Sequence, residues 1–399
     1  MPERYDTRAM LAKLVGFDTT SRNSNLPLIE WVAAYLASHG VRAELIHNRE
    51  RTKANLFATI GPASAGGIIL SGHTDVVPVD HQPWTRDPWT LGESEGRLYG
   101  RGTTDMKGFV AAALAKVPEW ARDGLARPIH LALSYDEEVG CTGVAGMIEH
   151  LGRSGLKPRA VIVGEPTDMR VVTSHKGGII GTATVTGVAG HSSQVHRTVN
   201  AVMYAAELVA HAVQLGEEMK SARQDPLFDP PYSTVQVNIM HGGSHGNVVP
   251  HECTFFWEHR ALPGVRLEDC ADRLRAYAAE TLLPSMRAVS PATDIRIEVL
   301  ALIPGLRDAP GSAAETLALR LAGRNATEAV AFGTEAGYFQ GLGIPTVVCG
   351  PGNIAQAHQP DEFIAIEQLA ACDRFLDRLT ETCRDPEDRP PRSKRETTP

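Results

Sequence analysis

Five histidine and carboxylate side chains of this chain could meet at one point. They are His73, Asp105, Glu138, Glu165 and His358. Three of them come directly after short apolar runs that read as strands, one opens a predicted helix, and the last lies in a loop after a strand. Because ligands of open α/β sheets bind beyond the carboxyl ends of the strands, we expect all five at one edge of a sheet.

The residue types in this set are those of a metal site. Three carboxylates and two imidazoles in one place carry negative charge that is costly to bury unless cations neutralise it. Mixed oxygen and nitrogen ligands suit zinc, with cobalt or manganese as alternatives. One catalytic zinc ordinarily takes three protein ligands, whereas two ions about 3.5–4 Å apart can share a larger set and activate water. The set therefore predicts a two-metal hydrolytic centre.

Two further carboxylates lie beside these candidates. Asp75 is two residues after His73, and alternate residues of an extended chain share a face, so Asp75 could orient the imidazole. Glu137 precedes Glu138 but points elsewhere, which would place it as a general base beside the attacking water. Taken alone, a His-x-Asp or Glu-Glu pair is more often a solvated turn. Their repetition at successive strand ends favours the catalytic interpretation.

A second group of candidates lies in the middle of the chain. His191 follows a predicted strand in the motif GHSS, and Asn247 and Arg260 flank another strand. A planar guanidinium suits bidentate recognition of a carboxylate, so Arg260 is a candidate for substrate binding. Each of these residues, taken by itself, is more often an ordinary surface residue.

The elements that carry these residues alternate in two patterns. Residues 1–175 and 303–383 show strand–helix alternation, which predicts an α/β domain with a mostly parallel sheet and helices on both faces. Residues 176–302 follow the order βαββαβ, which predicts an inserted ferredoxin-like domain. The tail 384–399 has no aliphatic residue and four prolines, and we expect it to be disordered. Within these domains we expect helices at 6–17, 26–39, 109–122, 143–152, 199–215, 267–283, 313–323 and 367–379.

Composition excludes several classes of function. The 399 residues carry a formal net charge of −8, and no basic stripe interrupts it, which argues against a nucleic-acid partner. No apolar run approaches the ~18 residues of a membrane span, and the N-terminal residues do not resemble a signal peptide. The six cysteines form no Cys-x-x-Cys pair, which is typical of reduced thiols in the cytoplasm. A Gly-rich phosphate loop between a strand and a helix is also missing.

With these residues in place, the sequence resembles the co-catalytic metallo-amidohydrolases, which include deacetylases, desuccinylases and carboxypeptidase-like relatives. The resemblance runs from about residue 6 to 382. The motifs occur in the family's order: SGHTDVVPVD, GRGTTDMKG, SYDEEVGCTG, VGEPT, GHSS and GPGNIAQAHQPDEF.

The resemblance implies a role for each candidate. Asp105 would bridge two metal ions, His73 and Glu165 would complete one site, and Glu138 and His358 the other. Asp75 would orient His73, and Glu137 would be the general base.

For the second group, the resemblance implies a homodimer formed by the inserted domain. His191 would reach the partner's active site and stabilise the oxyanion. Arg260 and Asn247, with the backbone of Gly350 and Gly352, would hold the substrate carboxylate.

The stretches FDTTSRNSNLPLIEW, KANLFATIGP and FGTEAGYFQ are most similar to the acetylornithine deacetylase branch. That branch implies hydrolysis of N2-acetyl-L-ornithine in arginine biosynthesis. Three related activities stay open at this point: desuccinylation, dipeptide cleavage and removal of other N-acyl groups from amino acids. A catalytically silent metal-binding or dimerisation protein is the alternative from another class.

Overall fold

The computed structural model describes residues 3–64, 66–122 and 124–385, and these form two compact units. The first unit comprises Met1–Thr173, Asp308–Glu328 and Thr334–Pro399, and the second comprises Ser174–Arg307 with Ala329–Gly333. The second unit thus includes a short stretch, 329–333, that the sequence-based division at 176–302 leaves in the first. Most of the tail that we expect to be disordered, 386–399, lies outside the described residues.

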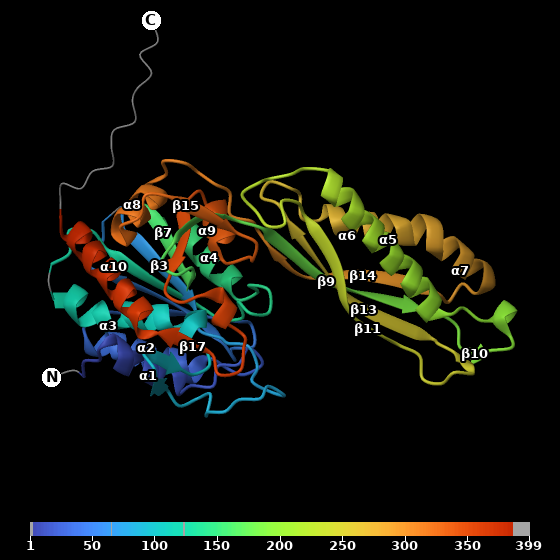
Figure 1. The fold of residues 1–399 in the computed structure, drawn as a ribbon, viewed down its shortest axis with the longest axis horizontal. Helices are drawn as coiled ribbons and strands as arrows, with labels where there is room; N and C mark the ends of the chain where they lie inside the picture. Colours follow the sequence, from blue (N-terminus) through green and yellow to red (C-terminus); the bar gives the residue numbers. More distant parts are fainter. Residues whose placement is uncertain (1–2, 65, 123, 386–399) are drawn as a thin grey trace, which may run out of the picture. The chain divides into compact units, whose positions relative to one another are not determined.

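An eight-stranded sheet forms the centre of the first unit (Figure 1). Its strands lie in the order β1-β2-β6-β3-β7-β16-β8-β15. The four central strands β6, β3, β7 and β16 run parallel to one another, whereas the pairs β1–β2, β2–β6 and β16–β8 are antiparallel. The α/β class with a mostly parallel central sheet is therefore confirmed. The strands are β1 Ala43–His47, β2 Ala54–Ile60, β3 Ile68–His73, β6 Ile129–Ser134, β7 Ala160–Pro166, β8 Val171–His175, β15 Thr327–Val330 and β16 Thr346–Gly350.

Helices cover both faces of this sheet because alternate strand residues point to opposite sides. On β3, Ile68 and Leu70 join the core formed with five helices, whereas Ile69 and His73 point to the other face, where α4 and α9 pack. The helices of the first face are α1 Thr7–Val15, α2 Leu26–Ser38, α3 Gly108–Arg122, α8 Ala313–Ala322 and α10 Ile366–Arg384. Those of the second face are α4 Val144–Ser154 and α9 Ala336–Gly341.

Several short strands of the first unit cannot be recognised from the sequence. A three-stranded sheet joins β4 Gly92–Ser94, β5 Arg97–Tyr99 and β17 Phe363–Ala365, and the last of these comes from the distant C-terminal part of the chain. Strands β8 and β15 extend one edge of the large sheet. Segments of three to five residues show no readable period, so their pairing partner rather than their own sequence decides their structure.

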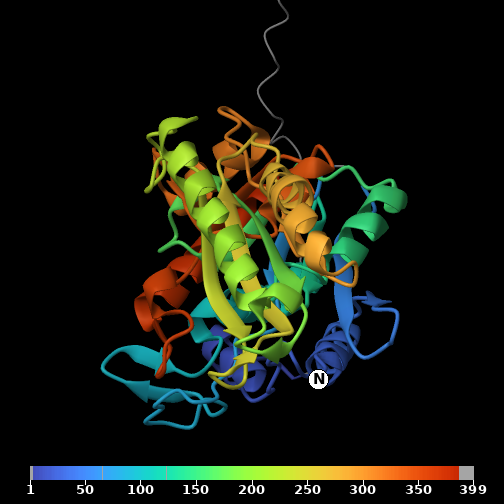
Figure 2. The same ribbon diagram turned by 90° about the vertical axis from the view of Figure 1, so that its right-hand side faces the viewer.

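The second unit has a four-stranded antiparallel sheet in the order β11-β13-β9-β14. Its strands are β9 Gly177–Thr186, β11 Thr234–Gly242, β13 Glu252–Ala261 and β14 Asp294–Ile303. Helices α5 Ala201–Ser221, α6 Asp269–Tyr277 and α7 Leu283–Val289 cover one face (Figure 2). The helix that we expect over 267–283 is present as α6, which continues through a π-helical stretch, Ala278–Leu282, into α7 and ends at Val289.

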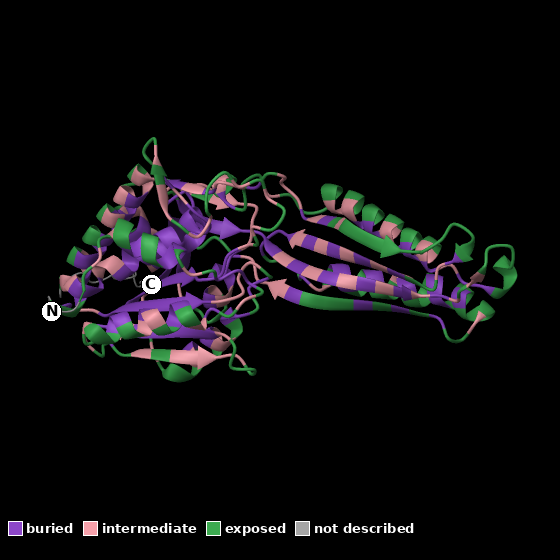
Figure 3. Ribbon diagram, turned by 90° about the horizontal axis from the view of Figure 1, so that it is seen from below, coloured by how far each residue is buried: buried purple, intermediate pink, exposed green. Residues whose placement is uncertain are grey.

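In the sheet of the second unit, one face packs against the helices and forms the core, and the other face is partly exposed. Residues of β9 and, after the exposed Glu252, those of β13 alternate between buried and partly buried, which Figure 3 shows as alternating purple and pink. A small ribbon of β10 Gly190–His191 and β12 Val248–Val249 lies beyond this sheet. Among the described residues, no helix is long and apolar enough to cross a membrane.

Candidate active site

Strand β3 ends at His73, and the chain buries this imidazole almost completely. Its Nδ1 lies 2.9 Å from the main-chain oxygen of Asp75. A carbonyl oxygen can only accept, so Nδ1 carries a proton, and Nε2 is the ring nitrogen that faces the other side chains of the site. Nε2 points to two carboxylates, at 3.0 Å from Asp105 Oδ1 and 3.7 Å from Glu165 Oε1. This orientation makes Nε2 the ring atom that could bind a metal ion.

The side chain of Asp75 accepts hydrogen bonds from the turn that carries Glu137 and Glu138. Its carboxylate lies 3.6 Å from His73 Nδ1, beyond a normal hydrogen bond, so the main-chain oxygen is what orients the ring. The two carboxylate oxygens instead accept hydrogen bonds from the backbone amides of Glu137 at 3.1 Å and Glu138 at 3.3 Å. Ser21 Oγ donates a third, at 2.7 Å. Asp75 therefore holds the turn that carries both glutamates.

Asp105 lies in the segment Thr103–Lys107 directly before α3, where its own backbone is not helical (φ −122°, ψ 93°). One carboxylate oxygen faces His73, and the other, Oδ2, lies 3.1 Å from Nε2 of His358. A carboxylate with an imidazole at each oxygen has the geometry of a group that bridges two cations.

His358 closes the other side of the site. Its Nε2 lies 2.9 Å from Glu138 Oε2 as well as close to Asp105. Its side chain is 49 % exposed, whereas both carboxylates are nearly buried. The site therefore opens to solvent beside His358.

The structure thus brings the five candidate ligands together with Glu137. Two overlapping groups have ligand atoms within 4.8 Å of one another: His73 with Glu137 and Glu165, and His73 with Asp105 and Glu138. Glu137, which we expect to be a base, is geometrically able to bind metal as well.

The electrostatics of the site fit divalent cations. Burial, helped by the neighbouring carboxylates, raises the pKa of Glu138 to about 8 and holds that of Glu165 well above its usual range. Although burial disfavours the protonated imidazole, Glu165 and Asp105 hold the pKa of His73 well above 6.5. The hydrogen bonds with Asp105 and Glu138 raise the pKa of His358 to about 10. All four pKa shifts have the same cause, which is an excess of negative charge in a buried site. Two divalent ions would neutralise this charge.

Burial also raises the pKa of Glu137 to about 7. A carboxylate with a pKa near neutrality can both accept and return a proton at physiological pH, which is what a general base in hydrolysis must do. Its Oε1 accepts a weak hydrogen bond from Cys141 Sγ at 3.3 Å.

Glu362 is a site residue that sequence reasoning missed, although it stands in the motif HQPDEF. Its buried carboxylate accepts hydrogen bonds from the backbone amides of Gly102 (2.9 Å), Thr104 (2.9 Å) and Asp105 (3.1 Å). The guanidinium of Arg101 pairs with it at 2.8 Å. One carboxylate therefore holds the whole loop that presents Asp105.

Glu335, at the start of α9, was also missed. It is 1 % exposed, its Oε1 lies without a hydrogen-bond partner, and burial raises its pKa to about 7. The motif FGTEAGYFQ contains it, but a glutamate before a helix is usually a cap, so no pattern marked it.

The remaining candidates lie on different units. Gly350 ends β16 in the first unit, and Gly352 has a positive φ of 89° just beyond it. His191, Asn247 and Arg260 all belong to the second unit. The main-chain oxygen of Asn247 accepts the amide of Ser192 at 3.0 Å, which ties Asn247 to the β10 segment that carries His191.

Comparison with known proteins gives a family. Residues 69–382 match the model of peptidase family M20/M25/M40. The acetylornithine deacetylase of Proteus mirabilis (strain HI4320) is 36 % identical over 368 residues, which cover 91 % of this chain and 92 % of that protein. The acetylornithine deacetylase of Pasteurella multocida (strain Pm70) is 36 % identical over 360 residues, covering 89 % and 91 %.

Solved structures agree with this assignment at the level of the fold. An M20 family metallo-carboxypeptidase from Sulfolobus solfataricus superposes with a TM-score of 0.75 at 18 % identity, covering 94 % of this chain and 99 % of that one. The aminopeptidase PepT from Bacillus cereus superposes with a TM-score of 0.69 at 19 % identity, covering 95 % and 98 %. The chain therefore belongs to peptidase family M20/M25/M40 and is an amidohydrolase.

Proposed function

We propose that this protein hydrolyses N2-acetyl-L-ornithine to L-ornithine and acetate. The observation that carries the proposal is the group of buried His73 and Glu165 with partly buried Glu137, a carboxylate with a pKa of about 7 beside side chains that could hold a metal ion. The similarity over some nine-tenths of the chain to two acetylornithine deacetylases supports the choice of substrate.

The geometry supports two metal sites. We infer that His73, Asp105 and Glu165 hold one divalent ion, and that Asp105, Glu138 and His358 hold the second, with zinc as the expected metal. When bound, the ions would supply a Lewis acid for the acetyl carbonyl and lower the pKa of the attacking water.

Glu137 carries the proton through the reaction. It accepts a proton from the attacking water as the new C–O bond forms, and it then donates that proton to the amide nitrogen as the C–N bond breaks. A leaving amide anion is thereby avoided, and the products are acetate and the free amine. Asp75 keeps Glu137 in place through its backbone amide.

We further propose that the active form is a homodimer in which His191 serves the partner's site. The strand register supports this. Arg260 pairs with Gly178 at one end of β13, and Glu252 pairs with Thr186 at the other end. The two ends of the strand are about 27 Å apart, because each residue of a strand adds ~3.4 Å. The β10–β12 ribbon that carries His191 lies next to the Glu252 end of β13, since the amide of Gly187 donates a hydrogen bond to the main-chain oxygen of His251. Arg260 and His191 of one chain therefore lie too far apart to contact one small substrate.

The surface that we propose for the dimer is the edge strand β11 with the adjacent helix α5. Ile239 and Met240 of β11 and Met203 and Val213 of α5 are exposed apolar residues. An edge strand has unpaired backbone groups that a second copy could satisfy. The six cysteines are all free and buried, which supports a reducing, cytoplasmic location.

The test is a substrate panel after chelation and after adding back zinc or cobalt. N2-acetyl-L-ornithine, N-succinyl-diaminopimelate, N-acetyl-methionine and a dipeptide are compared by kcat/KM. Preference for acetylornithine that disappears on chelation and returns with metal supports the proposal. Metal-dependent cleavage of another member contradicts the substrate and keeps the site, whereas metal binding without any turnover contradicts the function.

A further inference from the structure

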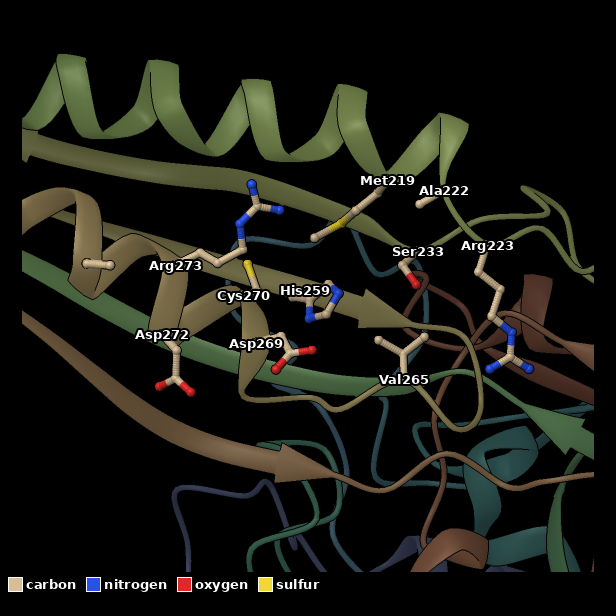
Figure 4. A pocket seen from close by; sticks show the side chains of 11 residues that line it. Met219, Ala222, Arg223, Ser233, His259, Val265, Asp269, Cys270, Asp272 and Arg273 are labelled. Atoms are coloured by element: carbon tan, nitrogen blue, oxygen red, sulfur yellow. The ribbon is translucent and has the colours of Figure 1, made fainter.

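A cavity of about 580 Å³ is lined only by residues of the second unit, and no candidate metal ligand is among them (Figure 4). It opens between the C-terminal part of α5, the helix α6 and the strand β13. Its apolar lining includes Met219, Val265 and Ala276. Its volume is in the range of cavities that bind small molecules.

The strongest evidence for a ligand is His259, which lines this cavity. Its side chain is 1 % exposed, and neither ring nitrogen has a partner at normal hydrogen-bond geometry, although the Leu267 main chain lies close enough to affect its pKa. It continues the inward-facing row of β13, where Cys253, Phe255 and Trp257 are all apolar or aromatic and buried. A leucine would fill this position more favourably, because a buried polar group without a partner destabilises the fold. A histidine here is explained by a partner that enters the cavity.

The imidazole is neutral at physiological pH. Burial lowers the pKa of His259, against smaller opposing effects of the Leu267 main chain and Asp269. A neutral imidazole offers one N–H donor and one acceptor nitrogen. The inner end of the cavity therefore suits a hydroxyl or amide group rather than a charge.

Most of the charged side chains that line the cavity form ion pairs with neighbouring side chains. Asp269 and Asp272 both pair with Arg266 at 2.8 Å, and Arg273 pairs with Glu218 at 2.5 Å. Arg223 is exposed on the cavity lining, and within the described part of the chain no acidic side chain pairs with it. In Figure 4 Arg223 lies at one end of the cavity and Arg273 at the other. The uncompensated charge of the lining is thus the positive charge of Arg223.

We propose that this cavity binds a small organic carboxylate that has an apolar body and a second hydrogen-bonding group. The carboxylate pairs with the guanidinium of Arg223, the body packs on Met219 and Val265, and the second group bonds to the ring of His259. A guanidinium binds a carboxylate by charge-assisted, often bidentate, hydrogen bonds, so Arg223 contributes most of the specificity for an anion.

The experiment measures binding of three probes to the full-length protein by titration calorimetry or ligand-observed NMR. The probes are 4-hydroxyphenylacetate, phenylacetate, which lacks the hydroxyl, and 4-hydroxyphenylacetamide, which lacks the charge. We expect 4-hydroxyphenylacetate to bind most tightly. Loss of the charge should weaken binding roughly tenfold or more, because charge-assisted hydrogen bonds are stronger than neutral ones. A tenfold loss corresponds to about 1.4 kcal/mol. No binding of either carboxylate at millimolar concentration overturns the proposal.

Three variants locate the site. Arg223→Ala should weaken carboxylate binding roughly tenfold, and Ala276→Trp should abolish it by filling the cavity from its exposed rim. The matched control is Arg287→Ala, which removes an exposed arginine of α7 that does not line the cavity. Equal affinities in Arg223→Ala, Ala276→Trp and the wild type would place the probe elsewhere and overturn the proposal.

His259→Leu separates a binding role from a structural one. If the ring serves a ligand, this variant keeps or raises the Tm of the ligand-free protein and loses the preference for 4-hydroxyphenylacetate over phenylacetate. A markedly lowered Tm with an unchanged preference shows instead that the imidazole supports the fold, and it contradicts the proposal.

Discussion

The carboxylate of Glu362 accepts a hydrogen bond at 3.1 Å from the backbone amide of Asp105, a residue 257 positions away in the chain. The same carboxylate binds two more amides of the loop and the guanidinium of Arg101. Asp105 faces both His73 and His358, so the position of this one aspartate affects the whole metal-binding set. Glu362 is thus a positioning residue for the site.

Glu362→Gln should weaken metal binding by about 10–100-fold, as loss of a group that orients a ligand commonly does. The glutamine cannot pair with Arg101, and leaving a buried charge unpaired costs on the order of 3–5 kcal/mol of stability. Competition with a chromophoric chelator measures the first effect, and denaturant unfolding the second. Glu367→Gln, an exposed glutamate at the start of α10, is the control and should change neither. Unchanged metal affinity in Glu362→Gln would contradict the positioning role.

Glu137→Gln and Glu138→Gln should separate proton transfer from metal binding. Without its ionisable group, the Glu137 variant should lose about 10²–10⁴-fold in kcat while it still binds two metal ions. The Glu138 variant should lose metal, because Glu138 faces His358 at 2.9 Å. Metal content by elemental analysis and kcat under saturating metal distinguish the two. A Glu137 variant that binds one ion fewer would show that Glu137 is a ligand.

Acid should destabilise the fold partly through His130. Burial lowers the pKa of this imidazole to about 4, whereas the unfolded chain titrates near 6.5. The unfolded state therefore binds more protons between these values, so stability is present above pH 6.5 and is lost as the pH falls towards 4. The difference corresponds to about 3 kcal/mol at most.

His130→Phe keeps a ring against Phe57, whose centroid lies 5.5 Å from that of His130, but it cannot titrate. We expect its unfolding free energy to fall less than that of the wild type between pH 7 and 4, measured by urea denaturation. His150→Phe, which replaces another imidazole beside Phe57, is the matched control. A wild-type slope in His130→Phe would rule out this source of acid sensitivity.

Ile239→Lys should dissociate the proposed dimer. The side chain is 51 % exposed on the edge strand β11, so the fold of one chain should tolerate the lysine, whereas a second copy would have to bury its charge. Light scattering after size-exclusion chromatography measures the mass, and kcat should fall with it if His191 acts in the partner's site. Leu300→Lys, on the opposite edge strand β14, is the control. A monomeric wild type, or a dimeric Ile239→Lys variant, would contradict the proposed interface.

The sequence by itself determined the class of the fold and the candidate ligands. Apolar runs that end at or within a few residues of His73, Glu138 and Glu165 are local signals, because a buried parallel strand must be continuously apolar and its carboxyl end is where polar groups can emerge. The alternation of the second unit is equally local, since each strand of an antiparallel sheet needs one buried face.

Only the tertiary structure decided which groups hold these residues in place. Glu362 binds the loop of Asp105, and Asp75 binds the turn of Glu137, through contacts between segments that are distant in the chain. Likewise, the cavity beside His259 exists because two helices and a strand leave a space that no period of the sequence records. Hydrogen bonds to backbone amides and unfilled volume depend on where other segments pack, and so carry no local pattern.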